Sequence, residues 1–206
     1  MQARRHFALP RSQRPPIPRR VAQPKTIGAE EIHAAIERLA AAIVEHHRPP
    51  TSILFLGIAN GGIELAKRLT ARVVKLAPAV SAKIGTLDIS FHRDDFGRNP
   101  IPKEFAATHI PADVNGAHII LVDDVLFSGR TIKAALDELF DHGRPTKVEL
   151  AILADRGGRR LPFAPDYCGL VVPATESQKV VVNLDAKDSR HDQIRVEASV
   201  SRTSAL

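Results

Sequence analysis

The chain has 206 residues, 44% of them hydrophobic, which is enough for one domain with its own core. Tryptophan is absent and aromatics are scarce, so the core should be aliphatic, and the single cysteine, Cys168, excludes an internal disulfide and favours a reducing, cytoplasmic location. No apolar run approaches the ~20 residues of a membrane-spanning helix, so no membrane partner is expected.

The net charge of +6 is concentrated at the start of the chain. Seven basic side chains precede the first acid, Glu30. With these removed from the 29 basic residues, 22 remain against 23 acidic ones, so the rest of the chain carries no average signal for nucleic-acid binding. Residues 1–26 also contain five prolines, which predicts a disordered basic tail. The tail is interpreted either as an arm that contacts polyanions or as a solubilising extension.

From Ile27 onward, helical and strand patterns alternate along the chain. Apolar residues at helical spacing predict helices around 32–43, 63–69 and 132–140. Apolar runs predict strands at 53–56, 84–91, 118–122, 148–153, 170–172 and 180–184. One glycine, three prolines and mixed charge between 93 and 111 are typical of a long loop. The alternation predicts an α/β domain over 27–190, with a mostly parallel central sheet flanked by helices, and 191–206 are expected to form a flexible tail.

The most informative segment joins a strand, two acids, a small polar turn and a helix. Ile119–Val122 is wholly aliphatic, as in a central parallel strand, and Asp123 and Asp124 follow at its carboxyl end, where open α/β sheets bind ligands. The turn Ser128–Thr131 opens into the helix from Ile132, so its N–H groups and hydroxyls can cradle a phosphate. Taken alone, the acids could be merely solvated and the turn merely a cap. Found in this order on one strand–turn–helix unit, the acids and the turn are a much more specific signal for a ligand site than either is alone.

Val122–Thr131 resembles the phosphoribosyl pyrophosphate (PRPP) signature of type I phosphoribosyltransferases, in a form similar to that of the PyrR group. Members of that group are pyrimidine operon attenuation regulators that also act as uracil phosphoribosyltransferases. Residues 86–95 resemble the strand that leads into the group's mobile active-site loop, and 155–162 resemble its base-binding segment. The resemblance covers roughly 32–184 and implies the type I phosphoribosyltransferase fold with a small hood region.

The resemblance implies a transferase of pyrimidine salvage that converts uracil and PRPP to UMP and pyrophosphate, with Mg²⁺ as cofactor. Asp123 and Asp124 would bind the ribose hydroxyls and are candidate Mg²⁺ ligands beside PRPP itself. Arg93, on the mobile loop, would close over the pyrophosphate, and Asp155 and Arg156 would contact uracil. The implied PRPP- and nucleotide-binding residues are Asn60, Gly61, Gly62, Val125, Leu126, Phe127, Ser128, Gly129, Arg130 and Thr131.

Two features depart from the group's pattern. The pyrophosphate loop reads Asn60-Gly61-Gly62, where many members have Thr-Arg-Gly. On the first helix Glu37, Arg38 and Ala41 stand where the regulators carry a Thr-Arg pair and a His, and Glu37 would repel an RNA backbone. Candidate RNA contacts are Arg38, Arg159, Arg160 and Lys179.

Two alternatives to a uracil enzyme follow. One is a non-catalytic, nucleotide-sensing attenuator that binds RNA and responds to UMP. The other is a phosphoribosyltransferase for another nucleobase, because base choice depends on backbone geometry that sequence does not show. The resemblance also implies a homo-oligomer, a dimer or larger.

Overall fold

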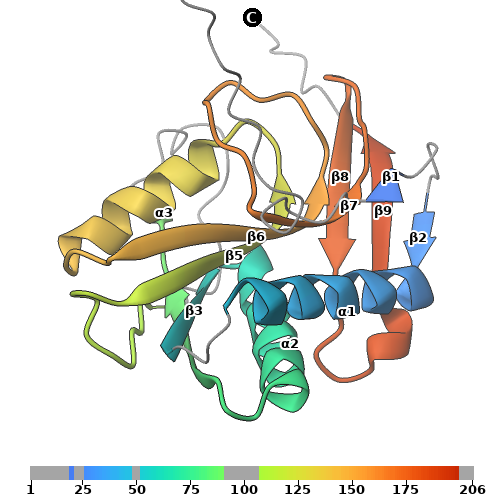
Figure 1. Cartoon of the computed structure of the whole chain (residues 1–206). Helices are drawn as coiled ribbons and strands as arrows, with labels where there is room; N and C mark the ends of the chain where they lie inside the picture. Colours follow the sequence, from blue (N-terminus) through green and yellow to red (C-terminus); the bar gives the residue numbers. More distant parts are fainter. Residues whose placement is uncertain (1–18, 21–25, 48–51, 91–106, 200–206) are drawn as a thin grey trace, which may run out of the picture.

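The computed structural model describes residues 19–20, 26–47, 52–90 and 107–199. Within these ranges one sheet of six parallel strands forms the centre of the molecule, in the order β1-β7-β6-β5-β3-β4 (Figure 1). Its strands are β1 (Arg19–Arg20), β3 (Ser52–Ile58), β4 (Ser81–Leu87), β5 (His118–Leu126), β6 (Lys147–Asp155) and β7 (Tyr167–Val171). The predicted α/β class with a mostly parallel central sheet is confirmed.

Helices cover both faces of this sheet. α1 (Ala29–His46) and α2 (Gly61–Leu76) pack on one face, and α3 (Arg130–Asp141) packs on the other. The helix expected at 63–69 is longer at both ends, because apolar residues at helical spacing continue to Val73 and the two glycines belong to its first turn. Figure 1 shows α3 separated from α1 and α2 by the strands.

Alternation along the central strand β5 divides the core into two halves. Ile120 and Val122 pack with α1 and α2, whereas Ile119 and Leu121 pack with α3. All four side chains are at most 1% exposed. Because β5 is buried on both faces, its sequence is continuously aliphatic until Asp123, and this burial fixes where the first polar side chain of the strand lies.

A second, antiparallel sheet of three strands forms the hood, in the order β2-β9-β8. It joins β2 (Thr26–Gly28), β8 (Gln178–Asn183) and β9 (Gln193–Ala198). The expected flexible tail over 191–206 is therefore wrong for 193–198, since Ile194 is 1% exposed in the core and β9 pairs on both edges. The expected disordered tail likewise fails at Arg19–Arg20, where the backbone pairs with β7, and at Thr26; its other residues lie outside the described ranges.

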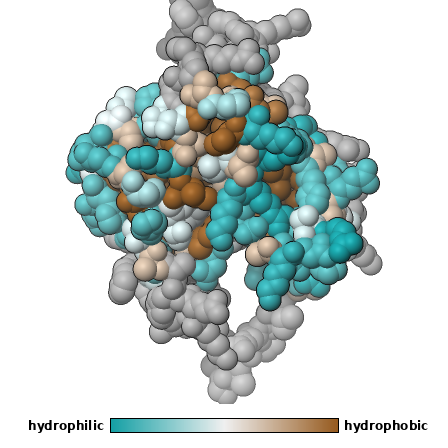
Figure 2. Space-filling model, turned by 90° about the horizontal axis from the view of Figure 1, so that it is seen from below, coloured by the Kyte–Doolittle hydropathy of each residue, from teal (hydrophilic) through white to brown (hydrophobic). Residues whose placement is uncertain are grey.

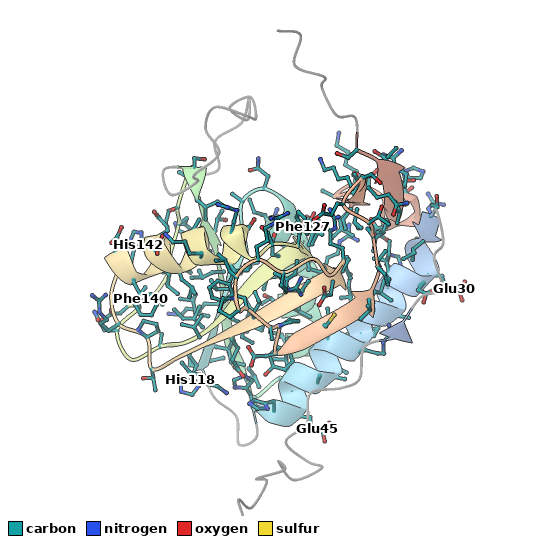
Figure 3. The ribbon with its side chains drawn as sticks, turned by 90° about the horizontal axis from the view of Figure 1, so that it is seen from above. Glu30, Glu45, His118, Phe127, Phe140 and His142 are labelled. Carbon is teal, nitrogen blue, oxygen red and sulfur yellow. The ribbon has the colours of Figure 1, made fainter. Side chains whose placement is uncertain are left out.

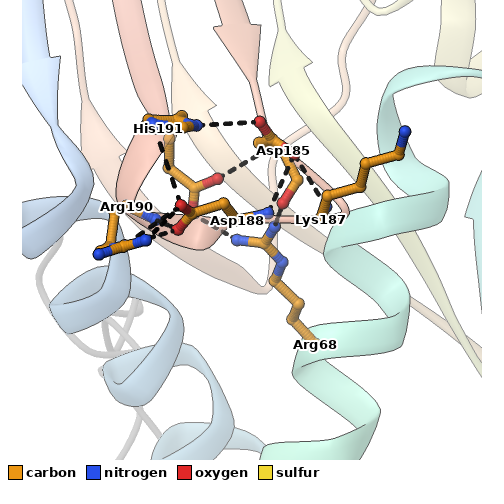
Figure 4. A network of polar contacts seen from close by, with 7 residues as sticks. Arg68, Asp185, Lys187, Asp188, Arg190 and His191 are labelled. Atoms are coloured by element: carbon orange, nitrogen blue, oxygen red, sulfur yellow. Dashed lines mark hydrogen bonds and ion pairs between the residues drawn. The ribbon is translucent and has the colours of Figure 1, made fainter.

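A buried aspartate links the hood to α2 through hydrogen bonds and an ion pair. Asp192 is 2% exposed and follows the short 3₁₀ helix η3 (Ser189–His191). It binds the guanidinium of Arg68, the ring Nε2 of His33 at 2.9 Å and the backbone N–H of Asp185 at 2.8 Å. Figure 4 shows Arg68 reaching from α2 into the loop that carries Asp185 and Asp188. Since α2 begins at Gly61, this cluster sets how the hood sits above the start of that helix.

The surface seen in Figure 2 is mostly hydrophilic, with apolar colour in patches between polar side chains. Among the described residues, the large apolar side chains counted as exposed are Val74, Leu76 and Phe140. No helix in the described ranges has both the length and the apolar character needed to cross a bilayer.

Candidate active site

Asp123 and Asp124 lie within β5 rather than after it. Pairing with β6 continues past the acids, with Asp123 opposite Ile152 and Leu126 opposite Asp155, so the strand predicted to end at Val122 runs four residues further. Asp123 is 5% exposed, and its Oδ1 accepts the N–H of Asp124 at 3.1 Å. The acid pair is thus held rigidly at the carboxyl edge of the sheet, as a ligand site requires.

The start of α2 lies directly against these acids. A Cβ atom at Gly61 would stand 2.5 Å from the carboxylate atoms of Asp124, and one at Gly62 would stand 2.0 Å from the carbonyl oxygen of Val122. Both distances are shorter than real Cβ contacts. At Gly62 the obstacle is backbone, so only glycine permits this approach, whereas a side chain at Gly61 would require the end of the Asp124 side chain to move. Asn60 joins Ala59 through a cis peptide bond just before the helix.

Burial raises the pKa of Asp124 above its ordinary value, although hydrogen bonds from backbone N–H groups and the positive charge of Lys179 oppose the shift. Lys179 lies on the hood strand β8, which crosses above the end of β5. A carboxylate whose pKa is raised by burial is typical of a functional site, because a bound substrate or cation can stabilise its charge further.

The phosphate turn predicted at 125–131 joins β5 to α3. Gly129 has φ 90°, a left-handed conformation, and α3 begins at Arg130 rather than at Ile132. A Cβ atom at Gly129 would lie 2.9 Å from the Phe163 ring, so glycine is needed for both conformation and space. The Oγ of Ser128 accepts the N–H of Arg130 at 3.3 Å. Thr131 then falls in the first turn of α3, where N–H groups favour anions.

The side chains expected to contact uracil are engaged within the protein. Asp155 accepts the N–H of Gly157 at 2.8 Å and the guanidinium of Arg159 at 2.6 Å. Arg156 is 7% exposed, stacks 3.9 Å above the ring of Phe127 and donates to the carbonyl of Thr175 at 2.9 Å. Burial lowers the pKa of this arginine. Figure 3 places Phe127 between α3 and the hood, and Arg156 packs on its ring.

The four candidate RNA contacts differ in their surroundings. Arg38 is exposed on α1 and donates to the carbonyl of Gly169 at 3.2 Å. Arg159 is bonded internally, to the carbonyls of Leu126, Phe127 and Phe163 and to Asp155. Arg160 is exposed, with Glu176 at 3.3 Å, and Lys179 is exposed near Asp124. Sequence reasoning missed the internal role of Arg159.

Arg93 and most of its loop lie outside the described residues. Both ends of that loop are tied to the fold, because Thr86 and His109 exchange two backbone hydrogen bonds of 2.9 Å. Thr108 accepts the N–H of Asp88 at 3.0 Å and donates to Glu138 of α3 at 2.7 Å. The loop that carries Arg93 thus leaves and re-enters the fold beside β4 and α3.

The described residues contain no group of three or more His, Cys, Asp and Glu side chains that could hold a metal alone. Mg²⁺ commonly binds through one or two carboxylates together with substrate phosphates and water. Asp123 and Asp124 fit that donor set, since both are oxygen ligands and Asp124 is desolvated.

Comparison with known proteins assigns this site to a family. The phosphoribosyl transferase domain model matches residues 28–187. The fold is shared with the hypoxanthine-guanine phosphoribosyltransferase of Bacillus anthracis, at TM-score 0.60 and 17% identity over 85% of this chain and 98% of that one. The hypoxanthine phosphoribosyltransferase of Trypanosoma cruzi gives TM-score 0.60 and 19% identity over 86% and 98%. The chain therefore belongs to the phosphoribosyltransferases and is an enzyme of that class.

Its sequence relatives narrow the placement to the PyrR proteins within that family. The bifunctional protein PyrR 1 of Lactiplantibacillus plantarum is 42% identical over 175 residues, which cover 84% of this chain and 96% of that protein. The bifunctional protein PyrR of a Picosynechococcus species is 40% identical over 164 residues, covering 80% and 92%. The resemblance read from residues 122–131 is confirmed over most of the chain.

Proposed function

We propose that the protein is a uracil phosphoribosyltransferase that converts uracil and PRPP to UMP and pyrophosphate. One observation carries the proposal: the acid pair of β5, the glycine start of α2 and the phosphate turn meet at one edge of the sheet, with Gly61 directly against Asp124. PRPP presents a ribose, a pyrophosphate and a 5′-phosphate, and these three elements match those groups in order. The choice of uracil rests on the PyrR relatives.

In the proposed mechanism the protein contributes positioning and charge rather than a covalent nucleophile. Asp123 and Asp124 accept hydrogen bonds from the ribose hydroxyls, while the turn at 128–131 donates to the 5′-phosphate. These contacts hold the sugar C1 in line with the uracil nitrogen, which replaces a bimolecular encounter by an oriented one. As the C1–pyrophosphate bond breaks, positive charge develops on the sugar, and the carboxylates beneath it favour that state.

The start of α2 at Gly61 is proposed to receive the leaving pyrophosphate, because the backbone N–H groups in the first turn of a helix favour anions. Asp123 and Asp124, together with PRPP itself, would hold Mg²⁺, which would neutralise part of the pyrophosphate charge. Arg93 is proposed to add a second positive charge from its loop. With water excluded, the activated sugar reacts with uracil instead of being hydrolysed.

The test is a base panel. Purified protein is incubated with PRPP, Mg²⁺ and, separately, uracil, orotate, hypoxanthine, guanine and xanthine, and the nucleotides are identified by mass. UMP from uracil alone is the expected result. A purine nucleotide would keep the reaction class and overturn the base, and nucleotide binding without any product would overturn catalysis.

A second proposed activity is regulation through RNA, because the relatives are named bifunctional and their group is identified with pyrimidine operon attenuation. Arg38, Arg160 and Lys179 are the exposed candidates, whereas Arg159 is held internally. A pyrimidine-operon leader RNA should bind with an affinity that falls with salt and changes with UMP. Binding that is insensitive to UMP would count against this activity.

A further inference from the structure

Three successive backbone carbonyl groups of the phosphate turn accept hydrogen bonds from the segment that follows β6. The carbonyl of Leu126 accepts the N–H of Arg156 at 3.1 Å and the guanidinium of Arg159 at 3.2 Å. The carbonyl of Phe127 accepts the guanidinium of Arg159 at 2.8 Å. The carbonyl of Ser128 accepts the N–H groups of Arg160 at 3.0 Å and Leu161 at 2.9 Å.

Because the peptide bond is planar, these contacts also determine the direction in which the neighbouring N–H groups point. In a trans peptide unit the C=O and the following N–H point in opposite directions. When the carbonyls of Leu126, Phe127 and Ser128 are turned toward the supporting segment, the N–H groups of Phe127, Ser128 and Gly129 are turned away from it. Their donors then face the side proposed to receive the 5′-phosphate, as an anion cradle requires.

Arg159 is the side chain on which this orientation depends most. In the described part of the chain it is the donor that holds the Phe127 carbonyl, and so it alone fixes the Phe127–Ser128 peptide. Its remaining N–H groups bind Asp155 at 2.6 Å and the carbonyl of Phe163 at 3.1 Å, which fixes the guanidinium plane. Gly157 and Gly158, with φ of 74° and 77°, turn the chain back so that Arg159 can reach the end of β5.

We propose that Arg159 is a positioning residue that orients the phosphate turn for PRPP, an inference that rests on the proposed transferase function. Only a guanidinium offers N–H donors in one plane to several acceptors at once. A lysine retains the charge but supplies a single point of attachment. The Ser128 N–H would then sample orientations that no longer meet the phosphate.

The first experiment compares Arg159→Lys with the wild type in steady-state kinetics and in calorimetric binding of ribose 5-phosphate. Loss of orientation removes binding of the phosphate in both the ground and the transition state, so the KM for PRPP should rise at least about tenfold while kcat at saturating PRPP stays within about threefold. The affinity for ribose 5-phosphate should fall by a similar factor. An unchanged KM and an unchanged affinity would overturn the proposal.

Arg144→Lys is the matched control. Arg144 also donates to backbone carbonyls, including that of Gly143 at 3.0 Å, but it lies beyond the end of α3, next to the amino end of β5. Its replacement should leave the KM for PRPP unchanged. An equal rise in both variants would indicate general loosening and would overturn a specific role for Arg159.

Two further measurements keep the inference testable if Arg159→Lys does not fold. In Arg159→Ala, added guanidinium ion at millimolar concentration should restore part of the affinity for ribose 5-phosphate, and no restoration would contradict the proposal. In the wild type, hydrogen exchange of the Ser128 amide should slow when ribose 5-phosphate binds; an unchanged rate would place that N–H elsewhere. Ribose 5-phosphate contains no base, so these binding and exchange measurements can still be interpreted if the protein makes no UMP.

Discussion

Two buried acids on neighbouring strands lie at opposite ends of the same sheet and have opposite electrostatics. Asp124 sits at the carboxyl end of β5, where burial raises its pKa. Glu149 sits near the amino end of β6 and is 3% exposed. Burial alone would raise the pKa of Glu149 too, but hydrogen bonds and charge from His47 and Lys147 outweigh it and lower the pKa to about 2.

The partners of Glu149 come from three elements. His47 Nε2 lies 2.7 Å from one carboxylate oxygen, while Lys147 and the Tyr167 hydroxyl donate to the other at 2.8 Å and 3.1 Å. Figure 3 shows His118, another ring of this cluster, at the end of the molecule away from Phe127. The protein itself completes the contacts of Glu149 and leaves those of Asp124 incomplete. This contrast fits a stabilising role for Glu149 and the substrate-binding role proposed for Asp124.

The largest expected effect is on catalysis and comes from Asp124→Asn. Removing the carboxylate beneath the ribose should lower turnover at least about tenfold, which is about 1.4 kcal/mol of barrier. Because burial disfavours the charged form of Asp124, the melting temperature should stay the same or rise. Steady-state UMP formation tests the expected loss of turnover, and thermal melting tests the expected melting temperature. Near-normal turnover would remove the ribose contact from the mechanism.

Gly61→Ala should have the next largest effect. The added Cβ would stand 2.5 Å from the Asp124 carboxylate and must displace either that acid or the start of α2. We expect a loss of kcat/KM for PRPP of about fivefold to tenfold, measured by initial rates, because displaced catalytic groups lose their orientation. Gly28→Ala is the control, since a Cβ there meets nothing within 4 Å. Equal losses in both variants would refute the steric explanation.

Glu149→Gln should lower stability while turnover of the folded protein is retained. Losing charged hydrogen bonds in a buried cluster typically costs about 2–3 kcal/mol. The folded pKa of about 2 lies below the ordinary 4.5, so this stabilisation is present above pH ~4.5 and is lost as pH falls toward 2. Denaturant titrations at pH 7 and pH 3 should show a larger difference in the wild type than in the variant. Equal pH dependence would show that Glu149 is not the titrating group.

Tyr167→Phe should give the smallest effect. It removes one donor to Glu149 and leaves His47 and Lys147 in place, so a loss of about 1 kcal/mol is expected. Urea unfolding at pH 7 measures it, and UMP formation should be unchanged. A loss as large as that in Glu149→Gln would mean that the hydroxyl organises the whole cluster.

The sequence predicted best those parts of the site that depend on neighbouring residues. Strand β5, the acids at its end, the polar turn and α3 are adjacent in the chain, so hydrophobic period and turn chemistry were sufficient. Boundaries were less accurate: the strand continues to Leu126, because its last residues are set by pairing with β6 rather than by their own polarity.

What the sequence could not predict depends on distant contacts. Gly61 and Gly62 were interpreted only as part of a pyrophosphate loop, and their close approach to Asp124 and Val122 could not be predicted. The alternation of Ile194 and Val196 was a signal for β9, but pairing with β2 and β8 decides it. Nothing in the local sequence indicates that the guanidinium of Arg159 binds carbonyls more than thirty positions earlier. Arg159 was interpreted as a candidate RNA contact because it could form a basic face with Arg160 and Lys179.

The hood is assembled from segments made at very different times during synthesis. β2 is translated before the whole parallel sheet from β3 to β7, yet it pairs with β9, which follows all of those strands. A nascent chain can therefore begin to pair the strands of its central sheet, including β5 with its acid pair, before the hood can close. The hood strand β8, whose Lys179 acts on Asp124, therefore gains its partner β9 only at the end of synthesis, so the side of the proposed ribose site that the hood provides is completed last.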